Sequence, residues 1–132
     1  MKLVIGGYAQ GKLNYILQKG DADRYTIWEA ELPDEEQLKE KGGHGKTVII
    51  NHFHKWVKEC MLRGGSPRNE TEAFLARNPE SILISDEIGN GIVPTDAFER
   101  EYREQTGRIL VFLADQADEV VRVICGIGQR IK

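Results

Sequence analysis

The chain has 132 residues, of which 40% are hydrophobic and 30% are charged, and its formal net charge at pH 7 is −3. This composition is typical of a globular protein, and the length predicts one domain covering residues 1–132. Acidic residues outnumber scattered basic ones, 21 to 18, which argues against a nucleic-acid binder. No apolar run approaches the roughly 20 residues of a membrane span, so we expect no membrane association. The two cysteines are far apart in sequence, and free thiols indicate a cytoplasmic protein.

Short apolar runs alternate with helical patterns along the chain. In chain order we expect a strand at 3–5, a helix at 11–19, a strand at 25–28, a polar surface segment with one loose turn at 32–45, a strand at 47–50, helices at 54–63 and 70–77, a strand at 82–84, a helix from 95 or 96 to 116, and a strand at 120–124. Most strand runs are continuously apolar, which is typical of strands buried on both faces of a parallel sheet. The sequence therefore predicts an α/β fold, an open and mostly parallel sheet flanked by helices.

The first predicted strand leads into a glycine-rich stretch, GGYAQGK, that almost matches a phosphate-binding loop. Gly6, four further residues, Gly11 and Lys12 fit the pattern, but Leu13 stands where Ser or Thr would bind magnesium. Such a loop presents backbone N–H groups to a phosphate, and the lysine adds a positive charge. Two interpretations stay open, a phosphate-binding loop and a tight strand-to-helix turn without a ligand.

A second stretch, GGHGKT at 42–47, ends like a phosphate loop but precedes a strand instead of following one. Its lysine would lie at the wrong edge of the sheet, because ligands of open α/β sheets bind outside the carboxyl ends of the strands. We interpret it as a flexible turn.

Polar residues follow two other predicted strands at the ligand-binding edge. Asp86 and Glu87 come after the strand at 82–84 and are candidates for holding magnesium, or else form a solvated strand end or helix cap. His52 and His54 follow the strand at 47–50. They could contact a substrate or phosphate, or lie at the surface, and a metal site is disfavoured because no further spaced ligand completes a tetrahedral set.

The last fifty residues, from ISDEIGNGIVP to the end, resemble the bifunctional cobinamide kinase / cobinamide-phosphate guanylyltransferase family of adenosylcobalamin synthesis. That family shows a strand ending in Asn-Glu, then V-G-x-G-I-V-P, a long helix with paired arginines and G-R, then A-D-E-V and a final hydrophobic strand. The matching residues here are Glu87, Gly89, Gly91, Ile92, Val93, Pro94, Arg100, Arg103, Gly107, Arg108, Asp118, Glu119, Val120, Gly126 and Ile127. At the N-terminus, the matching residues are Gly6, Gly7, Gly11 and Lys12.

The resemblance implies a P-loop NTPase-like sheet, ATP- or GTP-dependent phosphorylation of cobinamide (a corrinoid), and then attachment of GMP. It also implies homo-oligomers, namely trimers in which neighbouring subunits build the sites. This chain departs from the family at Leu13 and at Asn51, which stands in place of a strand-end carboxylate. It is also shorter where the family carries the histidine that forms a GMP-histidine intermediate. The one histidine in that interval, His44, lies in a glycine-rich turn and is not assigned that role.

We therefore expect a diverged nucleotide-binding family member, either a cobinamide kinase without guanylyl transfer or a non-catalytic nucleotide- or corrinoid-binding protein. We assign nucleotide binding to Gly6, Gly7, Gly11 and Lys12, and catalysis to Lys12, Asp86 and Glu87. Mg²⁺ is assigned to Asp86 and Glu87, and the substrate to His52, His54, Arg100 and Arg103.

Overall fold

A computed structural model describes residues 1–89 and 91–132 of the chain. In chain order its elements are β1 (Lys2–Gly6), α1 (Lys12–Gln18), a 3₁₀ turn (Ala22–Arg24), β2 (Tyr25–Glu29), α2 (Glu35–Glu40), β3 (Thr47–Asn51), α3 (Phe53–Leu62), α4 (Pro67–Arg77), β4 (Ile82–Asp86), α5 (Ala97–Gln116), β5 (Glu119–Ile124) and β6 (Ile127–Arg130). The predicted α/β fold is confirmed. Within the described residues, no helix combines the length and apolar character needed to cross a bilayer.

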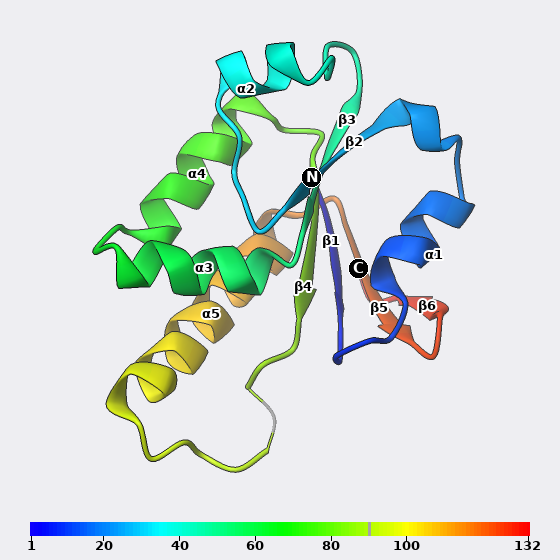
Figure 1. Ribbon diagram of the computed structural model, residues 1–132. Coiled ribbons are helices and arrows are strands. Elements are labelled where there is room, and N and C mark those ends of the chain that lie inside the picture. The colour runs from blue at the N-terminus through cyan, green and yellow to red at the C-terminus, as the bar shows by residue number, and fades with distance from the viewer. Residues whose placement is uncertain (90) are drawn as a thin grey trace.

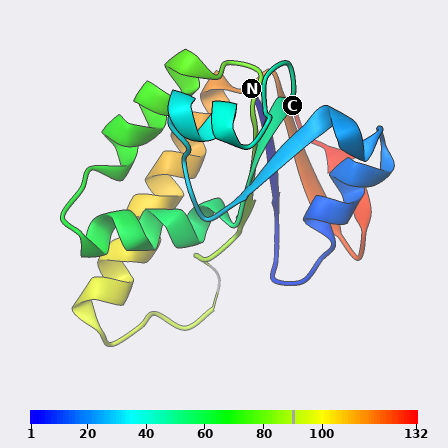
Figure 2. The same ribbon diagram turned by 45° about the horizontal axis from the view of Figure 1, so that its top comes forward.

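The six strands form one sheet in the order β2-β3-β4-β1-β5-β6. All neighbouring pairs are parallel except β5 with β6. Figures 1 and 2 show α3, α4 and α5 together on one face of the sheet and α1 on the opposite face. In the register of β1 and β4, Gly6 lies beside Asp86, so the glycine loop and the strand-end carboxylate begin at the same edge.

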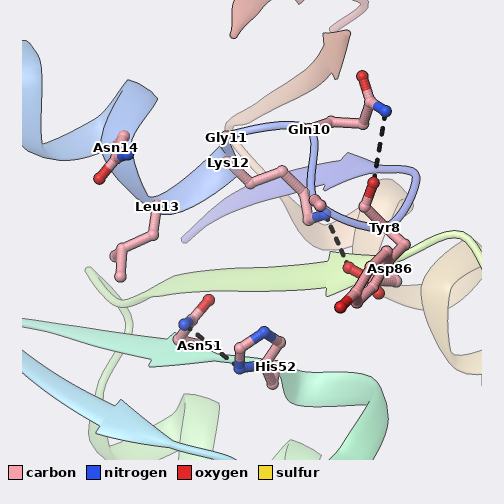
Figure 3. A pocket seen from close by; sticks show the side chains of 10 residues that line it. Tyr8, Gln10, Gly11, Lys12, Leu13, Asn14, Asn51, His52 and Asp86 are labelled. Carbon is pink, nitrogen blue, oxygen red and sulfur yellow. Dashed lines mark hydrogen bonds and ion pairs between the residues drawn. The ribbon is translucent and has the colours of Figure 1, made fainter. Parts of the chain in front are cut away.

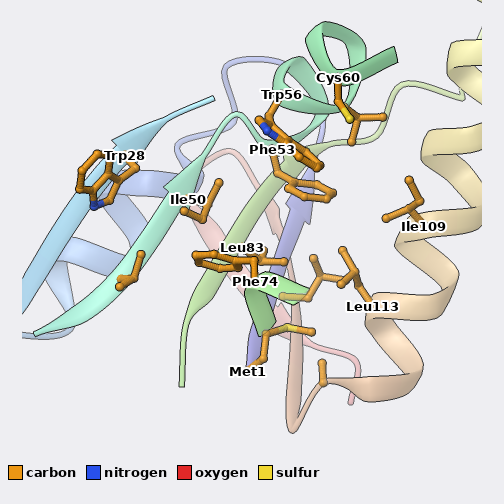
Figure 4. Packing of buried hydrophobic residues seen from close by; sticks show 14 of the residues in the cluster. Met1, Trp28, Ile50, Phe53, Trp56, Cys60, Phe74, Leu83, Ile109 and Leu113 are labelled. Atoms are coloured by element: carbon orange, nitrogen blue, oxygen red, sulfur yellow. The ribbon is translucent and has the colours of Figure 1, made fainter. Parts of the chain in front are cut away.

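Two apolar layers explain why the strands read as continuous hydrophobic runs. The larger layer lies under α3, α4 and α5 and contains the fully buried rings of Phe53 and Phe74 (Figure 4). The other layer lies under α1 and includes Val4, Ile16 and Ile49. Central strands contribute side chains to both layers, because successive residues of a strand point to opposite faces.

All five predicted strands are present, each longer by one or two residues. Three features differ from the prediction. The segment 32–45 contains the short helix α2, closed at its start by a capping box between Asp34 and Gln37. Helix α4 begins at Pro67 rather than residue 70, because Ser66 caps it and proline suits the first helical position. Strand β6 is an unpredicted hairpin partner of β5.

Candidate functional site

The loop between β1 and α1 has a backbone that is fixed by its neighbours. Ala9 and Gly11 both adopt left-handed conformations, with φ of 52° and 83°. The Gln10 side-chain oxygen accepts a hydrogen bond from the Cys125 N–H at 2.7 Å, and the Gln10 carbonyl accepts one from the Gly126 N–H at 2.8 Å. The turn between β5 and β6 therefore holds the loop from outside.

Gly6 is required because of a close backbone contact and not because of a left-handed conformation. A Cβ at this position would lie 2.5 Å from the backbone carbonyl oxygen of Val123 on β5. Glycine is thus needed where β1 ends because β5 passes too close for any side chain.

The loop forms one wall of a cavity of about 320 Å³ at the carboxyl ends of β1, β3 and β4 (Figure 3). Its lining residues are Tyr8, Ala9, Gln10, Gly11, Lys12, Leu13, Asn14, Asn51, His52 and Asp86. This is the edge at which open α/β sheets bind their ligands, and the volume suits part of a small molecule.

Lys12 and Asp86 form an ion pair in this cavity. The Lys12 Nζ lies 2.7 Å from Asp86 Oδ1, and it donates a hydrogen bond of 2.6 Å to the Gly7 carbonyl oxygen. The two side chains are only 7% and 14% exposed. A largely buried ammonium group is thereby held beside the loop, where an incoming anion could replace the carboxylate as its partner.

His54 lies next to Asp86 and contacts both its backbone and its carboxylate. The Asp86 backbone N–H donates to His54 Nδ1 at 3.1 Å, and His54 Nε2 lies 3.4 Å from Asp86 Oδ2. Burial lowers the pKa of His54 to about 4, although the Asp86 carboxylate acts to raise that pKa. The imidazole is therefore neutral at pH 7, with its proton on Nε2 because Nδ1 accepts a hydrogen bond.

His52 belongs to a second group, with Glu29 and Asn51. The His52 Nδ1 lies 2.7 Å from Glu29 Oε2, and the Asn51 side-chain amide donates to Glu29 Oε1 at 2.7 Å. Partial burial raises the pKa of Glu29, but the hydrogen bonds from Asn51 and His52 outweigh this and leave the pKa below its ordinary value. Sequence reasoning missed Glu29, whose signal was an acidic residue at the end of a strand, in register with Asn51.

The structure places Glu87, Arg100 and Arg103 outside the cavity lining. Glu87 accepts a hydrogen bond from Arg122 Nη2 at 3.0 Å. The two helix arginines donate to backbone carbonyl groups of the segment before α5, namely those of Pro94, Thr95 and Ile92. Both arginines instead line a separate surface hollow beside that segment.

The turn at 42–47 is at the start of β3, opposite the cavity edge, and lines a hollow with Arg77 and Asn78.

Among the described residues, no group of three His, Cys, Asp or Glu side chains could hold a metal ion. Asp86 provides the single carboxylate in the described cavity lining, and Leu13 adds no oxygen there. This set fits Mg²⁺, which is often held by one carboxylate, substrate phosphates and water.

The comparisons with known proteins agree with the resemblance seen in the sequence. Residues 17–131 match the family model for cobinamide kinase / cobinamide phosphate guanyltransferase. The chain is 45% identical over 51 residues to the bifunctional adenosylcobalamin biosynthesis protein CobU of Salmonella typhimurium, covering 39% of this chain and 28% of that protein. It is 25% identical over 101 residues to CobP of Pseudomonas aeruginosa, covering 72% of this chain and 58% of that protein. The chain thus matches less than two thirds of these relatives' length, and the family match begins after Lys12.

Proposed function

Because the chain belongs to the cobinamide kinase / cobinamide phosphate guanyltransferase family, we propose that it binds a nucleoside triphosphate, ATP or GTP, at the β1–α1 loop. We propose further that it transfers the terminal phosphate to a hydroxyl group of cobinamide, as a step of cobalamin biosynthesis. The single observation that carries this proposal is the buried Lys12 ammonium, held between Gly7 and Asp86 at the wall of the cavity.

The chemistry follows from these contacts. Phosphoryl transfer depends mostly on positioning and on positive charge around the transferred group. Lys12 supplies that charge when a phosphate oxygen takes the place of Asp86 Oδ1. Asp86 is then free to hold Mg²⁺, which when bound neutralises charge on the phosphates. Leu13 offers no metal ligand, so water would complete the coordination.

Guanylyl transfer is not part of the proposal. The histidine between β2 and β3 is His44, which lies in the turn at the opposite edge of the sheet. A nucleophile at that edge lies at the opposite ends of the strands from the proposed phosphate site. Homo-oligomerisation stays a prediction, which sedimentation velocity would test.

Thermal-shift titration with ATP, GTP and GDP, with and without Mg²⁺, tests nucleotide binding. A ligand at 100 times its Kd stabilises by about 2.7 kcal/mol, which should raise the Tm by about 10 °C in a chain of this size. We expect Lys12→Ala to abolish the shift and His44→Ala, at the other edge, to keep it. A shift that persists in Lys12→Ala would reject this placement of the site.

Turnover separates a kinase from a binding protein. Incubation with nucleotide, Mg²⁺ and cobinamide should yield cobinamide phosphate and nucleoside diphosphate in equal amounts. Nucleotide binding without product would favour a non-catalytic nucleotide- or corrinoid-binding protein, an alternative that Leu13 favours because one magnesium ligand is missing. A Leu13→Thr variant should then strengthen the magnesium dependence of binding.

A further inference from the structure

We propose that His52, oriented by Glu29, is the general base that takes the proton from the acceptor hydroxyl group during phosphoryl transfer. This inference rests on the proposed kinase function and assigns a role within the same cavity. Glu29 is then a positioning residue, because it acts through His52 and does not line the cavity.

The backbone conformation at His52 directs its side chain toward the cavity. The residue lies between β3 and α3 in a left-handed conformation, with φ of 52° and ψ of 45°. This conformation is uncommon for a residue with a Cβ, although histidine tolerates it better than most. The side chain is 40% exposed and lines the cavity opposite Lys12 and Asp86 (Figure 3).

The hydrogen bonds of Glu29 determine which ring nitrogen of His52 carries the proton. Both carboxylate oxygens of Glu29 accept, one from Asn51 Nδ2 and one from His52 Nδ1, each over 2.7 Å. A neutral imidazole that donates through Nδ1 carries a lone pair on Nε2. The nitrogen that is free of Glu29 is therefore the basic one, in the arrangement by which a carboxylate orients a histidine base.

His54 lacks this capacity despite lying two residues away. Its Nδ1 accepts the Asp86 N–H, and its Nε2 carries the proton and faces the Asp86 carboxylate. It is only 5% exposed and is absent from the cavity lining. Of the three histidines of the chain, His52 alone lines this cavity, since His44 lies at the other edge of the sheet.

In the proposed step, the acceptor hydroxyl group loses its proton as it takes up the phosphoryl group. The acceptor oxygen forms a bond to the γ-phosphorus of the nucleotide, and its proton passes to His52 Nε2. The bond between the γ-phosphorus and the β–γ bridging oxygen breaks, and its electron pair leaves on the nucleoside diphosphate. The resulting imidazolium is stabilised by Glu29, and it later returns its proton to water.

Several charged groups surround His52 and must be considered in any pH study. Glu29 faces it from β2, Lys55 lies in the first turn of α3, and the His54 ring centroid is 5.8 Å away. Lys12 and Asp86 face it across the cavity. Because so many groups titrate or carry charge here, chemical rescue is a sharper test than a pH profile.

The experiment uses His52→Gly, since glycine suits the left-handed backbone and leaves room for added imidazole. We expect kcat for cobinamide phosphorylation to fall about 10²- to 10⁴-fold, with nucleotide affinity nearly unchanged and with partial recovery in millimolar imidazole. His52→Asn, also suited to this backbone, should lose activity without rescue. Glu29→Gln should lower kcat less, and ¹⁵N NMR should show the His52 proton shifting away from Nδ1. His44→Ala is the matched control and should keep kcat.

The outcomes are separable. If the unaltered chain shows no Lys12-dependent nucleotide binding, the proposed function fails. If nucleotide binds but the unaltered chain forms no cobinamide phosphate, or His52→Gly keeps full kcat, the base assignment is overturned while the nucleotide site stands. Loss of kcat together with nucleotide affinity, without imidazole rescue, would make His52 structural. Acid-labile phosphate on His52 would make it a nucleophile and likewise overturn the base role.

Discussion

Replacing Lys12 by methionine tests whether the cavity is built around a buried ion pair. Two unit charges 2.7 Å apart interact by about 6 kcal/mol at an effective dielectric constant of about 20. Desolvation of both groups offsets part of this attraction. Removing one partner of a buried pair typically costs about 3–5 kcal/mol, because the other charge stays buried without compensation. We expect Lys12→Met to lower the free energy of unfolding by about that amount.

The assay is urea unfolding at pH 7 without nucleotide, in a double-mutant cycle with Asp86→Asn. The double variant should lose less than the sum of the single losses, with a coupling of about 2–3 kcal/mol. Lys58→Met is the matched control, because Lys58 Nζ also lies 2.7 Å from a carboxylate, that of Glu99, but both side chains are more than a third exposed. It should cost at most about 1 kcal/mol. Equal losses for the two lysines, or additive losses in the cycle, would refute the reasoning.

Three further predictions concern stability and reactivity. Gly6→Ala should lower the free energy of unfolding by about 1–3 kcal/mol, since its Cβ would collide with the β5 backbone. Gly107→Ala, in α5 with open space around it, should instead raise the free energy of unfolding by about 0.5–1 kcal/mol. Urea titrations in which Gly6→Ala is the more stable of the two variants would contradict the geometry. Because the pKa of His54 is lowered from 6.5 to about 4, between these pH values the unfolded chain binds a proton that the native chain does not. The free energy of unfolding should therefore fall by up to about 1.4 kcal/mol per pH unit on acidification through this window, and His54→Asn should flatten that slope in urea titrations at each pH. Burial and a hydrogen bond to a carboxylate raise the pKa of Cys60 to about 12, so a thiol reagent should titrate the exposed Cys125 at once and Cys60 only on unfolding.

The sequence predicted the sheet well, because its strands are buried on both faces and read as unbroken apolar runs. It did not predict β6, whose residues are mostly exposed and include few apolar ones. That strand is specified by the preceding turn, where Cys125 and Gly126 both adopt left-handed conformations. Strand β6 thus depends on backbone conformation rather than on a hydrophobic pattern.

The proximity of Lys12 and Asp86 follows from the order of the strand ends alone. Asp86 and Lys12 meet because β1 and β4 are neighbours in parallel register. Asp86 and Glu87 were treated as a pair, yet Glu87 instead accepts a hydrogen bond from Arg122 on β5, because adjacent residues in extended chain point to opposite sides. Glu29 was missed because its importance depends on a register between β2 and β3 that no local pattern reveals.

The hydrogen bond between Gln10 and Cys125 has a consequence for how the protein is made. The two residues are 115 positions apart, and β1 pairs with β4 and β5, which are also distant in sequence. Contacts between residues so distant in sequence form late, because the entropic cost of closing a long loop must be overcome first. During synthesis, β1 and its loop reach their final contacts only after β5 and the turn that follows it have left the ribosome. The cavity at the carboxyl ends of the strands is therefore among the last parts to take shape, and a nascent chain released before β5 would lack the turn that holds Gln10.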